Sequence, residues 1–341
     1  MSEINTWLLG GGFTVGIVFG VVVQRFRFCL VAAVSNLLLI NDRRQIVAFA
    51  MALVIAITGT QLLEIMEIVV IADSVYRNNI LDWFGAVVGG VIFGVGAVLS
   101  GGCAARTIIK TMEGNIHSLL ALLSFSIVAA ITQFGFLESI RIDLTHITSI
   151  ELTTDAGIAS VLSWSKWSVL VIIAISLVLF IYKSSKQASL KTMLIVGSVV
   201  GMLVVISWYV TGVLAQDEFN YKSPSAMTMS GPLARFGYVV ISGRVPELSF
   251  SILFVIGMAL SSLLSALTFR QFKITAPAKG MAKMAIFGGA LMGAGGILAY
   301  GCNVGQGLSG ISTLSIESVL AVAGMVGGIT AATKWMEKMI E

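Results

Sequence analysis

Charged residues are scarce in this sequence of 341 residues, and that scarcity identifies the class of protein. Asp, Glu, Lys and Arg together make up 11% of the chain, whereas about 25% is usual in soluble proteins. Apolar residues make up 57%. So few charges exclude a soluble fold, a secreted domain and a disordered chain. The composition predicts an all-α, polytopic integral membrane protein. The net charge of +4 then indicates basic loops facing an anionic leaflet rather than a nucleic-acid partner.

Cysteine and histidine are also few. The three cysteines, Cys29, Cys103 and Cys302, lie far apart and form no CxxC motif. An odd number without paired spacing excludes a disulfide framework and a structural zinc site. The two histidines, His117 and His146, have no metal-ligand spacing around them. We therefore expect no metal and no cofactor.

Long apolar runs divide the chain into predicted crossings, each needing about 20 residues. The run after Trp7 continues through the RFRFC stretch into residues 30–40, which are too few to cross alone. Residues 7–40 are therefore predicted to form one crossing made of a broken helix, and residues 1–341 a single transmembrane domain. The nine predicted helices cover residues 7–24, 45–71, 83–100, 116–137, 167–182, 192–214, 248–268, 284–300 and 316–336.

Lys and Arg gather in alternate loops, which predicts the orientation in the membrane by the positive-inside rule. The opposite loops, 72–82, 138–166 and 215–247, hold many of the acidic residues. Residues 1–6 lack the basic segment of a cleavable signal peptide. We expect a periplasmic N-terminus and a cytoplasmic C-terminus. The residues that mark the cytoplasmic loops are Arg43, Arg44, Lys183, Lys186, Lys191, Arg270, Lys273, Lys279, Lys283, Lys334 and Lys338.

The sequence contains an internal repeat. A shift of 199 residues places GGVIFGVGAVLSGGC (Gly89–Cys103) on GGALMGAGGILAYGC (Gly288–Cys302), matching five glycines and the cysteine. A weaker echo precedes Cys29, where Gly16 and Gly20 stand thirteen and nine residues upstream, the offsets that glycines also occupy in both copies. The copies are centred on residues 83–137 and 284–336. By the predicted orientation they run in opposite directions, an arrangement that in transporters places the substrate site at broken helices near mid-membrane.

Each cysteine stands where a glycine-rich or charged stretch interrupts a helix. Glycine lets the chain turn and leaves backbone N–H groups open to a ligand. Half-helices that begin after such breaks point positive dipole ends at one place, which favours an anion. The glycines alone also fit close helix packing. The predicted substrate-binding residues here are Cys29, Cys103, Cys302, Gly102, Gly301 and Asn303.

Arg27 and Arg106 are the charges nearest the cysteines and are predicted to bind the substrate too. An arginine at the centre of a membrane costs about 2.5–3.5 kcal/mol and needs a partner or water, which an anionic substrate would supply. Arg25, Glu64 and Glu67 are interpreted as interfacial.

Thiols suit a soft ligand that contains sulfur or selenium, because sulfur is a weak donor and a polarizable acceptor. Thiol–disulfide exchange would require a second cysteine nearby, and the sequence shows none next to any cysteine. Passage of Cu(I) would fit thiolate and thioether ligands, but no MxxxM ladder lies near the cysteines. A membrane-embedded thiol oxidoreductase or sulfurtransferase, and an accessory subunit without a path of its own, remain the alternatives.

Three stretches together resemble the YeeE/YedE family of bacterial inner-membrane proteins. They are QRFRFCL (Gln24–Leu30), SGGCA (Ser100–Ala104) and GCNVGQGL (Gly301–Leu308), and the helix PELSFSILFVIGMALSSLLSAL (Pro246–Leu267) extends the match. The resemblance covers essentially the whole chain. Ala104-Ala105-Arg106 departs from it, because most members have a small polar tripeptide there.

The resemblance implies a transporter rather than an enzyme, one that takes up a sulfur compound, thiosulfate above all. It implies an hourglass-like helical fold in which short half-helices meet at a positively charged constriction. Cys29, Cys103 and Cys302 match the family's three cysteines, which would pass thiosulfate along by transient S–H hydrogen bonds without covalent chemistry. It also implies a partner sulfur carrier of the TusA type for some members, and selenium species as another possible cargo.

Overall fold

The computed structural model describes residues 6–152, 154–162, 164–184, 190–216, 221–243, 248–278 and 280–340. Within them the chain is helical almost throughout. The strands β1 (Ile80–Leu81) and β2 (Ile150–Glu151) form a short antiparallel pair. The predicted all-α membrane fold is therefore confirmed. The predicted loop markers Lys186 and Lys279, and Pro246 of the quoted helix motif, lie outside the described residues.

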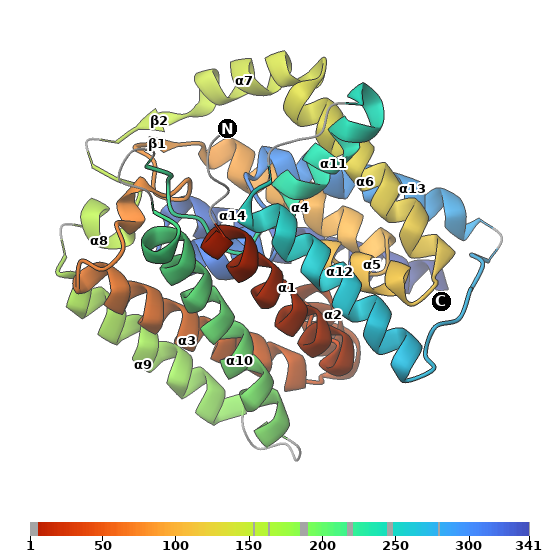
Figure 1. Cartoon of the computed structure of the whole chain (residues 1–341), viewed down its shortest axis with the longest axis horizontal. Coiled ribbons are helices and arrows are strands. Elements are labelled where there is room, and N and C mark those ends of the chain that lie inside the picture. The colour runs from red at the N-terminus through yellow and green to blue at the C-terminus, as the bar shows by residue number, and fades with distance from the viewer. Residues whose placement is uncertain are drawn as a thin grey trace.

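Eight described segments are long and apolar enough to cross a membrane, and two of them contain a break. α9 (Lys166–Ser184) overlaps the predicted crossing at 167–182, but its apolar part is shorter, so a total of nine remains a prediction. Figure 1 shows the bundle that these helices form. The eight segments are α1 (Thr6–Phe26) with α2 (Leu30–Ile40), α3 (Arg44–Ile65), α4 (Trp83–Leu99) with α5 (Ala104–Met112), α6 (Ile116–Phe134), α10 (Leu190–Tyr209) with the π-helical turn η2 (Val210–Leu214), α12 (Phe250–Thr268), α13 (Met281–Leu298) and α14 (Ile316–Ile340).

Several predicted boundaries were wrong. α3 ends at Ile65 rather than at 71, and Glu67, just beyond its end, adopts a left-handed conformation. α6 ends at Phe134 because Gly135 follows it. The predicted loops 138–166 and 215–247 contain short helices that no crossing-length pattern could indicate. These are α7 (Leu137–Thr148), α8 (Ile158–Val161) and α11 (Ser230–Ser242), and the turn η1 (Ile71–Asp73) lies in the loop before β1.

The glycines thirteen and nine residues before each cysteine lie at close helix contacts. A Cβ atom on Gly90 or Gly94 of α4 would collide with a backbone carbonyl of α14. Gly16 and Gly20 of α1 meet α12 in the same way, and Gly289 and Gly293 of α13 meet α6. A fourth pair without a cysteine, Gly197 and Gly201, lets α10 meet α3. Small residues let backbones approach closely, which is the packing expected in a membrane.

The two halves of the predicted repeat also contact each other. Gly89 of α4 lies against Gly295 of α13, and Gly96 lies against Gly288, so the helices pack antiparallel. Under the 199-residue shift Gly89 corresponds to Gly288 and Gly96 to Gly295. Each contact is therefore the counterpart of the other, as a two-fold relation between the copies would require.

The connections between helices group on two sides of the bundle. On one side Lys273 donates from its backbone N–H to Glu113, and Ser35 near the end of α2 pairs with Thr333 of α14. On the other side Thr145 donates to Asp82 at the start of α4, and Ile158 pairs with Leu314. We call the first the basic side, since it holds Arg43, Arg270 and Lys334, and the second the opposite side. The loops that lie together on each side are those that the distribution of Lys and Arg predicted to share a side.

The glycine contacts predict a difference between two helical glycines. Gly94→Ala places a Cβ against the Met325 carbonyl of α14, and we expect a loss of about 1–3 kcal/mol in stability from overpacking. Gly327→Ala is the matched control, because nothing lies within 4 Å of a Cβ there and the residue is exposed. The apparent melting temperature in detergent should fall for the first variant and stay or rise for the second. Equal melting temperatures would contradict the packing argument.

Candidate functional site

Each cysteine follows a helix break of the same form. The residue two positions before it has a positive φ, namely 54° at Arg27, 72° at Gly101 and 53° at Tyr300. A left-handed residue is a common way to end a helix. The backbone carbonyl of each cysteine then accepts a hydrogen bond from the N–H four residues on, at 2.7–2.9 Å. Every cysteine therefore stands where one helix has ended and another helical turn begins.

The segments that begin at the cysteines are α2, α5 and the π-helical turn η3 (Gly305–Gly310). Cys29 and Cys103 are the N-cap residues of α2 and α5, and neither cap is closed by a side chain. The first backbone N–H groups of a helix have no partner within it. Together with the helix dipole they favour an anion. This placement agrees with the sequence-based prediction for the cysteines.

Two of the thiols touch, although 74 residues separate them in the chain. The Cys29 thiol donates a hydrogen bond to the Cys103 sulfur at 3.4 Å. Both side chains are buried, with 4% and 1% of their surface exposed. Cys29 therefore has a second thiol beside it, that of Cys103, although no cysteine lies near it in the sequence. All three cysteines are free.

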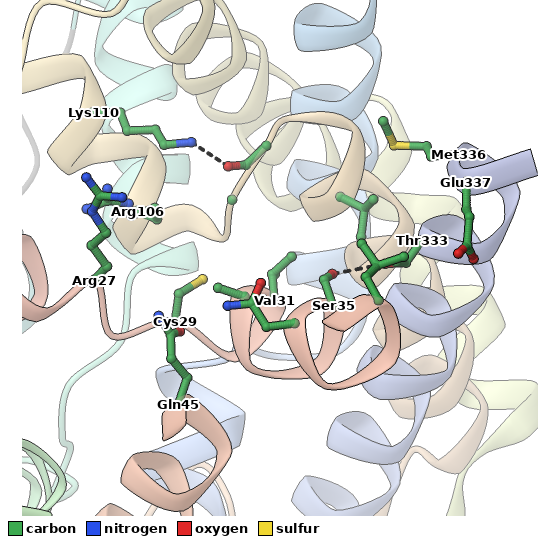
Figure 2. Close-up of a pocket in the computed structure, with 16 residues that line it drawn as sticks. Arg27, Cys29, Val31, Ser35, Gln45, Arg106, Lys110, Thr333, Met336 and Glu337 are labelled. Atoms are coloured by element: carbon green, nitrogen blue, oxygen red, sulfur yellow. Dashed lines mark hydrogen bonds between the residues drawn. The ribbon is translucent and has the colours of Figure 1, made fainter. Parts of the chain in front are cut away.

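A cavity of about 730 Å³ reaches this pair from the basic side. Its wall includes Arg27, Cys29, Gly102 and Arg106, four of the eight predicted site residues, and Lys110, which the sequence analysis missed. Figure 2 shows both guanidinium groups on one wall, above the Cys29 thiol. Lys110 donates to the Gly101 carbonyl at 2.6 Å and so closes the loop before Cys103.

The cations of this cavity lack anionic partners. Within the described ranges, no carboxylate forms an ion pair with Arg27, Arg106 or Lys110. The Nη1 atom of Arg106 is buried and has no hydrogen-bond partner there. A buried cation without a partner is costly. The arrangement therefore suits a small anion at this place.

The other four predicted residues, Cys103, Gly301, Cys302 and Asn303, do not line that cavity. Cys302 has no exposed surface, and it is close enough to Cys103 for the two side chains to interact electrostatically. Gln306 fixes the turn around it by donating to the Ala299 carbonyl at 2.7 Å and accepting from Ser318 at 2.5 Å.

Two aromatic rings pack between these two parts of the site. Phe28, which precedes Cys29, stacks on Phe49 of α3 with ring centroids 5.6 Å apart. A Cβ on Gly307 of η3 would lie 3.5 Å from the Phe49 ring. The rings therefore form an apolar contact between the Cys29 break and the segment that begins at Cys302.

A buried ionic cluster fixes the opposite side of the site. Glu64, which we expected at the membrane interface, is buried and accepts from Arg77 at 2.9 Å and from Lys166 at 2.8 Å. Arg77 also pairs with Asp155. Thirteen residues separate Glu64 from Arg77, across the end of α3, so no helical spacing indicated the pair. The cluster fixes the loop that holds Tyr76, the residue before Arg77.

Tyr76 is a site residue that sequence reasoning missed. It is buried, and its ring packs edge-on against Trp208 with centroids 6.2 Å apart. Burial raises the pKa of Tyr76, and the nearby Cys302 raises it further, while a hydrogen bond from Thr228 opposes them. The phenol therefore keeps its proton. No motif surrounds Tyr76 in the sequence, and only its place beside Cys302 indicates a role.

The fold and the site together define the class of protein. Bundled apolar helices, three of them broken at buried thiols, and a cavity lined by three cations and one carboxylate, Glu337, are the features of a membrane transport protein for a small anion. The chain belongs to the sulphur transport family, whose model matches residues 25–331. The predicted membership of the YeeE/YedE family is thereby confirmed, and the protein is a transporter rather than an enzyme.

Similar proteins include two that are named thiosulfate transporter TsuA. The one from Escherichia coli K12 is 23% identical over 338 residues, covering 95% of this chain and 93% of the relative. The one from Spirochaeta thermophila is 26% identical over 323 residues, covering 91% and 93%. The probable transporter YedE of E. coli is 26% identical over 119 residues, covering 34% and 27%.

The short distance between two thiols makes a prediction. Diamide, which accepts two hydrogens from a pair of thiols, should convert Cys29 and Cys103 into a disulfide, since an S–S bond of about 2.05 Å needs only a small approach from 3.4 Å. Mass spectrometry of the digested protein should find this cross-link in the wild type and in Cys302→Ala. It should be absent from Cys29→Ala. A cross-link to Cys302 in preference to this pair would contradict the geometry.

Proposed function

We propose that this protein takes up thiosulfate across the bacterial inner membrane. The observation that carries the proposal is the set of three buried thiols at helix breaks, two of them 3.4 Å apart, beside a cavity with unpaired cations. Thiosulfate has a soft terminal sulfur and charged oxygens. Thiols offer weak S–H donors and polarizable acceptors to the sulfur, while amides and guanidinium groups suit the oxygens.

The comparisons support this substrate. Relatives that align with more than nine-tenths of the chain are named thiosulfate transporters. This chain keeps a cysteine at all three breaks, so it has the soft groups that a sulfur-bearing anion would need. An anion of another sulfur or selenium species would use the same groups, and competition for uptake distinguishes them.

In the proposed mechanism the thiols pass the anion along without forming a bond to it. The anion meets Cys302 first and exchanges hydrogen bonds with its thiol. It then displaces the contact between Cys29 and Cys103, whose S–H groups turn to its terminal sulfur. Arg27 and Arg106 receive it in the cavity on the basic side. Each hydrogen bond to the anion contributes only about 1.5–3 kcal/mol, so the anion can exchange these contacts one at a time without a covalent step.

The direction of transport rests on the predicted orientation, in which the basic side is cytoplasmic and the C-terminus lies there. The reciprocal contacts between α4 and α13 support the inverted repeat, and an inverted repeat places the site near mid-membrane. A TusA-like sulfur carrier would then meet the anion at the mouth of the basic cavity. Co-purification with such a carrier would test that partner.

Replacing Cys302 by Ala tests the proposal. Uptake of ³⁵S-thiosulfate into proteoliposomes should fall to background, because the first thiol of the path is lost. The folded state should remain, because Ala fits in place of the small Cys side chain. Cys29→Ala and Cys103→Ala should each lower uptake as well. Wild-type uptake by Cys302→Ala would refute the relay, and a persulfide on any cysteine after turnover would refute its non-covalent form.

Arg106 offers a second test. Arg106→Gln removes the charge from a buried guanidinium whose Nη1 has no partner in the described part of the chain. A hydrogen bond to a charged group is worth about 1.5–3 kcal/mol, so the concentration for half-maximal uptake should rise about tenfold or more. Arg235→Gln is the control, since Arg235 is exposed on α11. If both variants behaved like the wild type, the basic cavity would have no part in transport.

A further inference from the structure

The opposite half of the site contains hydroxyl groups that the thiol relay does not use. Ser309 of η3 donates to the Met227 carbonyl at 2.8 Å and so holds the segment before α11 against η3. The next residue is Thr228. A Cβ on Gly305 would lie 2.8 Å from the Thr228 hydroxyl and 3.4 Å from the Tyr76 hydroxyl. Two hydroxyls from separate segments therefore converge at Gly305, three residues after Cys302.

The helix contacts give this place a counterpart. α5, which begins at Cys103, packs against α6 and α12, and α11 packs against the same two helices. α2, which begins after Cys29, packs against α3 and α14. The turn η3, which follows Cys302, packs against the same two helices. Under the 199-residue shift η3 corresponds to α5 and α14 corresponds to α6, so α11, which packs on α6, corresponds to α2, which packs on α14. On the basic side the two half-helices bring two thiols together.

On the opposite side the corresponding pair has only one thiol. The N-cap of α11 is Met229, which is fully buried, and Thr228 precedes it. Met229 therefore stands where α2 has Cys29 as its N-cap, and Thr228 lies just before it, next to the turn that begins after Cys302. Hydroxyls are found here where the other half has a second thiol.

The hydroxyls are ordered and stay protonated. The ring of Tyr76 is fixed against Trp208, whose indole N–H donates to Ser312 at 3.1 Å. Thr228 lies within hydrogen-bonding reach of Tyr76. One further buried donor, the Ser230 hydroxyl, has no hydrogen-bond partner among the described residues. Fixed neutral donors in a dry site bind charge strongly without reorganising.

We propose that Tyr76 and Thr228 form an outer binding station with Cys302, in which the two hydroxyls hold the oxygen end of the anion and the thiol faces its sulfur end. The station rests on the proposed function and adds to it the residues that recognise an oxyanion before it reaches the paired thiols. A molecule with terminal sulfur but no oxygens would lack the hydroxyl contacts. The station therefore selects for thiosulfate-like anions over sulfide.

Removal of single hydroxyl groups tests the station. Tyr76→Phe keeps the ring against Trp208, and Thr228→Val keeps the shape of the side chain. Each should raise the concentration of thiosulfate for half-maximal uptake into proteoliposomes about tenfold or more, because a hydrogen bond to a charged ligand is lost. Thr228→Ser should restore most of the affinity. Tyr221→Phe is the matched control, since Tyr221 is an exposed tyrosine that bonds to Asp73 at 2.6 Å.

The protection of the purified protein against heat by thiosulfate gives a second readout that needs no transport. In Tyr76→Phe and Thr228→Val the protection should require correspondingly more thiosulfate, while the melting temperature without ligand stays near the wild-type value. Wild-type half-saturation in both variants would overturn the station and leave the proposed function intact. If the wild type neither took up thiosulfate nor was protected by it, the proposed function would fail and the station with it.

Discussion

A backbone that is interrupted inside a membrane has to be enclosed by protein, and the rest of this structure depends on that constraint. At three places a helix stops, and the N–H and C=O groups freed there cannot be left facing lipid. The helices before the breaks meet their partners at glycines, so backbone lies directly on backbone. That packing surrounds each break with other helices. The polar ends of the half-helices are thereby available to a ligand and hidden from the bilayer.

The site is electrostatically unequal at its two ends. The cavity on the basic side is lined by Arg27, Arg106 and Lys110 and by one carboxylate, Glu337, whereas the part of the site around Cys302 has thiol and hydroxyl groups. On the opposite side Glu64, Arg77, Asp155 and Lys166 form ion pairs with one another. An anion would therefore find a lower potential energy toward the basic side. The charge distribution therefore favours the anion at the basic end of the site, while the direction of net transport follows the electrochemical gradient of the anion.

The sequence indicated the parts of the site that lie close together along the chain. Glycine and cysteine at fixed offsets predicted the breaks at 27–29, 101–103 and 301–302, because a local stretch determines where a helix ends. Contacts between residues that are far apart in the sequence could not be predicted in this way. The contact between Cys29 and Cys103 depends on how α1 and α4 are placed, and the approach of Tyr76 to Cys302 depends on a loop fixed by an ion pair. α11 was not predicted, because a helix of 13 residues is too short to be distinguished from a loop by hydropathy.

The contacts along the proposed path are closed in this structure. Cys302 has no exposed surface, the rings of Phe28 and Phe49 are stacked, and the paired thiols leave no room between them for an anion. Each of these contacts is weak, since a thiol hydrogen bond and an aromatic pair contribute about 1 kcal/mol apiece. An arriving anion can replace them one at a time with hydrogen bonds to its own charge, which are stronger. In the proposed mechanism the thiols that close the path are also the groups that bind the anion, so no separate gate is required to prevent leakage.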